Sequence, residues 1–264
     1  MPDFNIRKQP WVAPVLPAEI PHGDMPGDKV SIQEGHIQKA GVIFPALCDL
    51  LEKTMQESPT QRAVVSVCGG SGVGKSEIAS LLSFYLNAIG IGAYTLSGDN
   101  YPHRIPLYND AERLRVFRVS GIRGLLDAGL YDEEVRQNLD RLLQTGTEAD
   151  PKQTAAFPWL STYQSAGRSG LSHYLGTQNE IDFAEISGIL ARFRSGTDAL
   201  MLKRMGREET ALWYDRVDMR QISVLVVEWT HGNNDLLRGV DIPLFLHSTP
   251  QETLEHRRLR ARDG

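Results

Sequence analysis

The chain has 264 residues, a formal net charge of −5 and 41% hydrophobic residues, enough for one large globular domain or a domain with an appendage. The mild acidity argues against broad electrostatic binding to nucleic acid or to an anionic membrane surface. The sequence shows neither a signal-peptide pattern nor a stretch of ~20 apolar residues, and its two cysteines suit a reducing compartment, so we expect a cytoplasmic protein.

The N-terminal part of the chain divides into two predicted segments. Prolines are concentrated near the N-terminus and favour an extended arm over residues 1–27. Residues 29–41 have the pattern of a small hairpin, and residues 42–57 have helical spacing. We therefore predict an N-terminal appendage of hairpin and helix over residues 28–60.

From Arg62 onward the pattern is strand, glycine turn, helix and strand again, which indicates a βαβ unit. The strands are almost continuously apolar, as expected for a parallel sheet that is buried on both faces in an α/β domain. We assign residues 61–264 to this domain and expect an irregular excursion over residues 146–180. The predicted strands are residues 62–68, 92–99, 222–229 and 241–248, and the predicted helices are residues 76–90, 111–129, 132–146 and 180–196.

The glycine turn fits the pattern G-x-x-x-x-G-K-[ST], with a strand before it and a helix after it. Glycines let the backbone N–H groups wrap a polyphosphate at the positive end of the following helix. Lys75 would reach the β- and γ-phosphates, and Ser76 would place its hydroxyl on Mg²⁺. The pattern predicts a nucleoside triphosphate, taken as ATP, together with Mg²⁺. The nucleotide-binding candidates are Gly69, Gly70, Ser71, Gly72, Val73, Gly74, Lys75 and Ser76.

Two acidic residues follow predicted strands of the same sheet. Asp99 ends one strand and Glu228 ends another, and ligands bind in open α/β sheets at the edge where the parallel strands end. Acidic residues also end strands as turn formers or helix caps, but the glycine loop favours a functional interpretation here. The catalytic candidates are therefore Asp99 as the base, Glu228 on the metal side and Lys75 on the phosphates.

Polar residues near Asp99 are candidates for binding the phosphate acceptor. Tyr101, His103 and Arg104 lie within five residues of Asp99, so they stay near it in almost any backbone path. A cluster of basic residues precedes the strand of Glu228. These residues either bind an anionic group of the acceptor or lie solvated in a hairpin. The members of this cluster are Lys203, Arg204 and Arg207.

The last stretch, STPQETLEHRRLRARDG, predicts a basic helix that begins with a capping box at Thr249. Arginines at the end of such a helix either complement the helix dipole or close over the phosphates of a substrate. Because the chain also carries the glycine loop, we favour a lid near residues 249–264, in which Arg257 and Arg258 contact the nucleotide.

These motifs together resemble the phosphoribulokinase and uridine kinase family of P-loop kinases. The resemblance runs from about Arg62 to the end and is sharpest at GGSGVGKS, SGDNYPHR, VLVVEW and HRRLRARDG. It implies an α/β fold of the P-loop NTPase type, similar to nucleoside kinases, with three layers around a mostly parallel central sheet, plus the small N-terminal appendage. It also implies the same roles for Asp99, Glu228, Arg257 and Arg258: a base, a metal-side or substrate-side acid, and lid arginines.

The sequence departs from the family pattern in several places. Glu228 is followed by a tryptophan, where uridine kinases usually have a glycine, which puts nucleoside recognition in doubt. GDNYPHR is more similar to the phosphoribulokinase pattern and implies an anionic acceptor that contacts His103 and Arg104. The N-terminal 60 residues and residues 146–180 lie outside the resemblance. Because family members continue past the lid, we expect either a continuation beyond Gly264 or a differently built base pocket.

The sequence thus predicts an ATP-dependent kinase that phosphorylates a hydroxyl of a small polar, anionic metabolite similar to a sugar phosphate. An adenylylsulfate kinase or a nucleoside kinase is the alternative among enzymes. A nucleotide-binding regulatory module with little or no transferase activity is the alternative of another class, because the N-terminal helix could dock a partner. We expect a small-molecule acceptor as partner, no nucleic acid and no membrane, and leave a homo-oligomer open.

Overall fold

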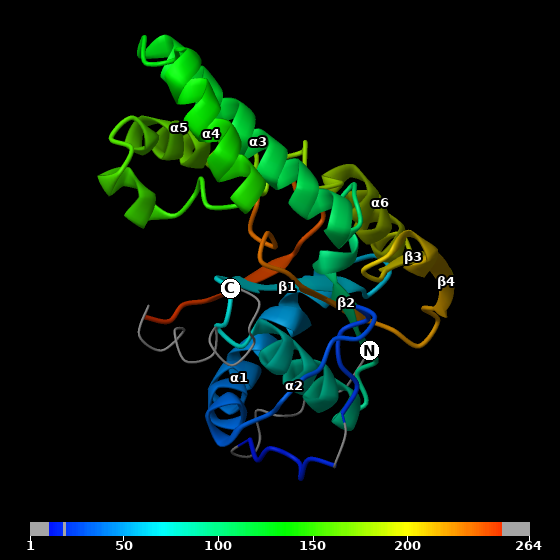
Figure 1. Cartoon of the computed structure of the whole chain (residues 1–264). Helices are drawn as coiled ribbons and strands as arrows, with labels where there is room; N and C mark the ends of the chain where they lie inside the picture. Colours follow the sequence, from blue (N-terminus) through cyan, green and yellow to red (C-terminus); the bar gives the residue numbers. More distant parts are fainter. Residues whose placement is uncertain (1–10, 18–19, 250–264) are drawn as a thin grey trace. The chain divides into compact units, whose positions relative to one another are not determined.

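The computed structural model describes residues 11–17 and 20–249, and Figure 1 shows the course of the chain. Its internal contacts divide the chain into two compact units. The first unit comprises Met1–Tyr101 and Asp182–Gly264, and the second comprises Pro102–Ile181. The first unit contains all of the strands that the structure describes, and the second unit is built mainly from helices.

A four-stranded parallel sheet forms the centre of the first unit, with the strand order β2-β5-β1-β6. The central strands β1 and β5 are buried along their whole length, as their apolar sequences require when both faces of a sheet are covered. The expected α/β fold with a mostly parallel sheet is therefore confirmed. The strands are β1 Ala63–Gly69, β2 Ala93–Ser97, β5 Val224–Glu228 and β6 Ile242–Leu246.

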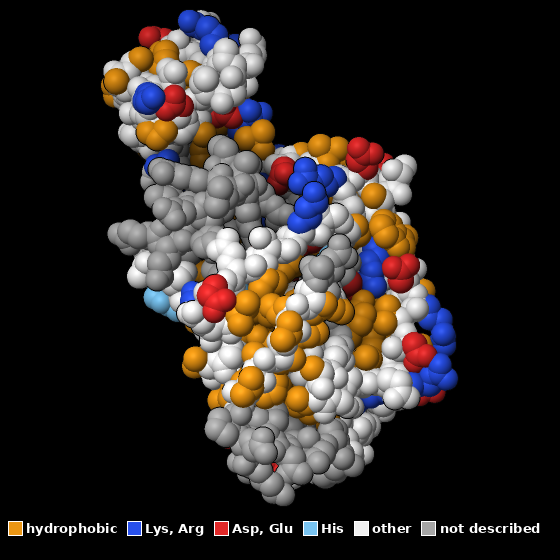
Figure 2. Space-filling model, turned by 90° about the horizontal axis from the view of Figure 1, so that it is seen from below, with side chains coloured by type: hydrophobic (Ala, Val, Ile, Leu, Met, Phe, Trp, Pro, Cys, Tyr) orange, Lys and Arg blue, Asp and Glu red, His pale blue; other side chains and the backbone are white. Residues whose placement is uncertain are grey.

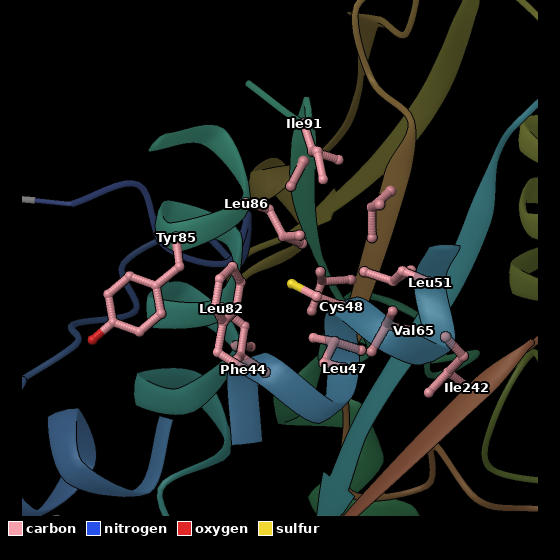
Figure 3. Close-up of a cluster of buried hydrophobic side chains, with 14 of the residues drawn as sticks. Phe44, Leu47, Cys48, Leu51, Val65, Leu82, Tyr85, Leu86, Ile91 and Ile242 are labelled. Atoms are coloured by element: carbon pink, nitrogen blue, oxygen red, sulfur yellow. The ribbon is translucent and has the colours of Figure 1, made fainter. Parts of the chain in front are cut away.

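Helices lie on both faces of this sheet in Figure 1, with α1 and α2 on one face and α6 on the other. The main core of the unit lies where α1 and α2 meet β1, and Figure 3 shows Phe44 and Leu47 of α1 turned toward Leu82 and Leu86 of α2 and toward Val65 of β1. All five side chains are buried, so the helices are fixed to the sheet mainly by apolar packing. The helices of this unit are α1 Glu34–Glu57, α2 Lys75–Ala88 and α6 Phe183–Arg194.

The predicted hairpin over residues 29–41 is wrong, because α1 already begins at Glu34. The amide of Gln33 donates to Nδ1 of His36, 3.1 Å away, and closes the first turn of this helix. Ala40, Phe44 and Leu47 then lie on one buried stripe with helical spacing. Helix α1 therefore belongs to the same core as β1 and α2.

The expected irregular excursion over residues 146–180 is wrong, because much of this stretch of the second unit is helical. A short 3₁₀ turn η3 and helix α5 occupy this stretch, and Leu160 and Tyr163 of α5 are fully buried against α3 and α4. Helices α3 and α5 approach each other closely at Gly121 and Gly124, where a Cβ atom would collide with Tyr163 and Ala166. The bounds are α3 Pro106–Asp127, α4 Glu133–Thr145, η3 Pro151–Ala155 and α5 Leu160–Ser172.

Two further strands, β3 Ala199–Met205 and β4 Leu212–Asp218, form an antiparallel hairpin in the first unit. The predicted lid near residues 249–264, including Arg257 and Arg258, lies outside the described residues except for Thr249. Figure 2 shows apolar side chains gathered on one face of the molecule. Val12, Val15 and Val42 are among the exposed hydrophobic residues that the structure describes. None of the described helices is long and apolar enough to cross a membrane.

Candidate active site

The glycine loop connects the end of β1 with the first turn of α2, as its sequence predicts. Gly72 and Gly74 have φ angles of 78° and 88°, in the left-handed region that favours glycine. At Gly69 a Cβ atom would lie 2.4 Å from the carbonyl oxygen of Leu246 in β6, so a side chain has no room there. The loop therefore begins at a point where the ends of β1 and β6 lie close together.

The start of α2 leaves its first backbone amides available to an anion. Gly74 occupies the N-cap position and provides no side chain to accept hydrogen bonds from these amides. The ammonium group of Lys75 folds back over the loop, where its Nζ donates to the carbonyl oxygen of Gly70 at 3.1 Å. Helix amides, the positive helix end and a lysine thus lie together at the start of α2, an arrangement that suits a polyphosphate.

Glu228 ends β5 at a place that the sheet register defines. It pairs with Ser97 of β2 on one side and with Val67 of β1 on the other, so Asp99 follows two residues after the paired position. Burial and the neighbouring Asp99 carboxylate raise the pKa of Glu228 to about 8, while Lys75 and a hydrogen bond with Ser76 act in the opposite direction. The glycine loop and the two predicted carboxylates thus meet at one edge of the sheet.

The side chains at this edge fit a magnesium ion held with phosphates. Ser76 offers a hydroxyl and Glu228 a carboxylate, and these two groups are hydrogen-bonded to each other. Mg²⁺ prefers oxygen ligands and is often held by one or two protein groups, with phosphates and water completing the shell. Among the residues that the structure describes, no group of three or more His, Cys, Asp or Glu side chains forms a metal cage. The donor set therefore suits a metal that arrives with a nucleotide.

Asp99 lies in a short 3₁₀ turn, η2 Gly98–Asn100, directly after β2. Gly98 packs against the ring of Trp229, and a Cβ atom at Gly98 would lie 2.1 Å from that ring. Trp229 itself is 1% exposed and packs on Phe183 of α6 with the ring centroids 5.3 Å apart. The tryptophan after Glu228 therefore braces the turn that carries Asp99.

The basic group of β3 is mostly engaged with acidic side chains. Arg204 Nη1 lies 2.8 Å from Asp24 Oδ2, and both side chains are 8% exposed. Arg204 Nε lies a further 3.1 Å from Asp215 Oδ2. Lys203 is buried, with Nζ 3.5 Å from Glu185 Oε2, whereas Arg207 is exposed beyond the end of the strand. Two of the three cations are thus held inside the first unit.

The other candidates for binding the acceptor fall on both sides of the boundary between the units. Tyr101 is fully buried in the first unit, and burial raises the pKa of its hydroxyl. His103 and Arg104 belong to the second unit. There, the His103 ring is hydrogen-bonded to the carbonyl oxygen of Gln178, and Arg104 donates to the hydroxyl of Tyr174. Both side chains are therefore tied to the second unit itself.

Sequence reasoning missed two residues that contribute to the site, Asp24 and Asn100. Asp24 lies in the predicted extended arm, which offers no motif, yet its carboxylate is buried and contacts the end of β2. No local pattern identifies such a residue, because its partners lie about 70 and 180 positions away in the chain. Trp229 was noticed only as a departure from a family pattern, and its packing against Gly98 depends on tertiary structure.

No protein-family model matches the chain. A bifunctional alpha-galactosidase/sucrose kinase of Mediterraneibacter gnavus is 38% identical over 227 residues, which are 86% of this chain and 19% of that protein. The chain thus spans about a fifth of the length of the curated relative that it matches. A crystal structure from Silicibacter sp. TM1040, provisionally named a fructose transport system kinase, is similar with a TM-score of 0.48 and 16% identity, and the match covers 83% of this chain and 81% of the other. A structural likeness at this level carries no argument about function.

Proposed function

We propose that this chain is an ATP-dependent kinase that transfers the γ-phosphoryl group to a hydroxyl of a sugar. The observation that carries the proposal is the meeting of Lys75, Ser76, Asp99 and Glu228 beside the glycine loop at one edge of the parallel sheet. The similarity to a protein whose name includes sucrose kinase supports it. A P-loop NTPase assignment fits the strand, loop and helix at residues 63–88.

Each residue of the group has a part in phosphoryl transfer. The loop amides and Lys75 bind the β- and γ-phosphates and stabilise the charge that spreads over the transferred group. Ser76 and Glu228 would hold Mg²⁺ together with a bound nucleotide, and the ion would supply positive charge beside the phosphates. Asp99 accepts the proton of the attacking hydroxyl, because it follows β2 at the same edge and its charge acts directly on Glu228.

The acceptor that we propose is a sugar without a phosphate group, which revises the expectation of an anionic metabolite. Two of the cations that we expected to bind an anionic acceptor are already engaged with carboxylates: Lys203 is paired with Glu185 in the first unit. Arg204 is paired with two carboxylates, those of Asp24 and Asp215. A neutral sugar needs hydrogen-bonding groups and no added cation, which agrees with these pairings and with the sucrose kinase in the relative's name.

The proposal can be tested by measuring ADP release from Mg²⁺-ATP with a panel of acceptors: sucrose, fructose, glucose, ribulose 5-phosphate, uridine and adenylylsulfate. We expect stimulation by a neutral sugar and not by the phosphorylated or nucleotide acceptors. Stimulation by ribulose 5-phosphate, uridine or adenylylsulfate alone would replace the sugar with that class. ATP binding without stimulation by any acceptor would favour a regulatory module.

The same assay tests the role of Asp99. Asp99→Asn should lower kcat by about 10²- to 10⁴-fold, because a general base contributes on this scale, with the KM for ATP nearly unchanged. Asp110→Asn is the matched control, since the Asp110 side chain is 72% exposed in the second unit. An Asp99→Asn enzyme that retains the wild-type kcat would show that Asp99 is not the base.

A further inference from the structure

The carboxylate of Asp24 is the centre of a buried hydrogen-bond network in the first unit. Its Oδ1 atom accepts from the backbone amide of Ser97 at 2.8 Å and from Nδ2 of Asn100 at 3.1 Å. Its Oδ2 atom accepts from the hydroxyl of Tyr94 at 3.0 Å and from Nη1 of Arg204 at 2.8 Å. The Oδ1 atom therefore contacts the end of β2 and the turn after it, whereas the Oδ2 atom contacts Tyr94 and Arg204.

The Oδ1 side of Asp24 attaches both flanks of the turn that carries Asp99. Ser97 immediately precedes the Gly98–Asn100 turn, and Asn100 is its last residue. The side-chain oxygen of Asn100 in turn accepts from the backbone amide of Met205 at 3.0 Å. A single 3₁₀ turn has few hydrogen bonds of its own and poor hydrogen-bond geometry, so these outside contacts, together with the packing of Gly98 against Trp229, hold the turn in place.

The Oδ2 side of Asp24 explains how a carboxylate is tolerated at this place. Burial raises the pKa of Asp24 and disfavours its charged form, while the Ser97 amide and the Arg204 guanidinium favour that form. Arg204 also donates to the hydroxyl of Tyr94 at 3.0 Å, so the three side chains satisfy one another. Such a network holds one arrangement of its members, because leaving any buried polar group unpaired is costly.

We propose that Asp24 is a positioning residue of the kinase: its Oδ1 atom holds the Gly98–Asn100 turn so that Asp99 faces the attacking hydroxyl. This inference rests on the proposed function of Asp99 as a base. It gives Asp24 of the N-terminal segment a positioning role in the reaction. A displacement of about 1 Å at a reacting group can lower a rate by about 10²-fold, so this role is measurable.

The test compares three variants of the full chain by their kcat, their KM values and their stability. Asp24→Ala removes the acceptor for the turn, and we expect kcat to fall by about 10- to 100-fold, with the KM for ATP and for the sugar within about 2-fold of wild type. Asp24→Asn keeps an amide oxygen for Ser97 and Asn100, so its kcat should recover to within about 3-fold of wild type. Its amide group faces the donors of Tyr94 and Arg204, so its stability should nevertheless fall.

Tyr94→Phe is the control, because it disturbs the network on the Oδ2 side without touching the turn. It should lower the melting temperature and keep the wild-type kcat. Equal kcat values for Asp24→Ala and Tyr94→Phe would overturn the inference, since the carboxylate would then stabilise the fold only. If Asp24→Ala does not fold, Asp24→Ala combined with Arg204→Met removes the stranded charge, and the same fall in kcat is expected.

Hydrogen–deuterium exchange separates this inference from the proposed function. Amides of residues 97–101 should exchange faster in Asp24→Ala than in Tyr94→Phe or wild type, because the Ser97 amide loses its acceptor and the turn loses its anchor. Unchanged exchange would contradict the positioning role. A wild-type protein that phosphorylates no sugar would contradict the proposed function, and the exchange rates would still show whether Asp24 holds the turn.

Discussion

Glu228 ends β5 at a place where an ionised carboxyl group lowers the stability of the folded chain. The carboxyl group is almost completely buried beside another acid, and both effects raise its pKa from 4.5 to about 8. A group arranged only for stability would be apolar or fully paired at such a place. Carboxyl groups with strongly perturbed pKa values cluster at functional sites, which is the interpretation that we favour for Glu228.

This shift predicts how stability depends on pH in the absence of nucleotide and metal. The pKa of Glu228 is raised on folding, so its stabilising contribution is complete below about pH 4.5 and is lost as the pH rises to about 8. Relative to Glu228→Gln, the wild-type protein should therefore lose free energy of unfolding on the order of a few kcal/mol between these limits. Urea denaturation in EDTA at pH 5, 6.5 and 8 measures this difference.

Glu133→Gln is the control for the pH dependence. Hydrogen bonds from Arg136 and Gln137 lower the pKa of the exposed Glu133 to about 2, so this residue stays ionised from pH 5 to 8. Its variant should follow the wild-type pH dependence throughout. If the free energy of unfolding depends on pH in the same way for wild type and Glu228→Gln, Glu228 ionises normally in the folded protein.

At the level of secondary structure, the apolar repeat predicted some helices and missed others. Strands β1, β2, β5 and β6 lie close to the predicted ranges because each is a short, almost continuously apolar run, and helices α2, α3, α4 and α6 lie close to theirs because each has an apolar period. Helix α5 has a sequence rich in glycine and serine, and its intrinsic helix propensity is low. It forms because α3 offers a complementary surface, and packing against a partner overrides propensity.

The close approach of α3 and α5 leads to a prediction about stability. Gly124→Ala should destabilise the second unit by about 1–3 kcal/mol, because the new Cβ atom would lie 2.3 Å from the Cβ atom of Ala166. Gly188→Ala in α6 is the matched control, since no atom lies within 4 Å of its added Cβ. That variant should gain up to about 1 kcal/mol from helix propensity. Thermal and urea unfolding of both variants check the prediction, and a neutral Gly124→Ala would mean that the helices separate easily.

At the level of the whole molecule, the sheet order decides which segments form the site. Strand β5 lies between β1 and β2 although it follows them by more than a hundred residues, and this insertion brings Glu228 next to both the loop and Asp99. The N-terminal segment belongs to the same unit and reaches the same edge through Asp24. The site is therefore assembled from both stretches of chain that make up the first unit, the one before the second unit and the one after it.

Binding of Mg²⁺-ATP should stabilise the molecule as a whole. At a nucleotide concentration 100 times the dissociation constant, the gain is about 2.7 kcal/mol, which corresponds to an increase of roughly 5 to 10 °C in the melting temperature. Lys75→Met should abolish most of this increase, because it removes the cation beside the loop. Lys39→Met, at an exposed position in α1, should keep it. A full increase in Lys75→Met would place the nucleotide away from the glycine loop.

The sequence by itself determined the strand, glycine loop and helix, since their spacing encodes a local structure. It also predicted that Lys75, Ser76, Asp99 and Glu228 lie at one edge of the sheet, because each adjoins a strand end or the loop. Only the tertiary structure decided that α1 replaces a hairpin, that α5 forms, and that Arg204 pairs with Asp24. The physical reason is the range of the interactions. Period and turn chemistry act over a few residues, whereas a buried ion pair or a helix contact joins partners whose separation in the chain leaves no local pattern.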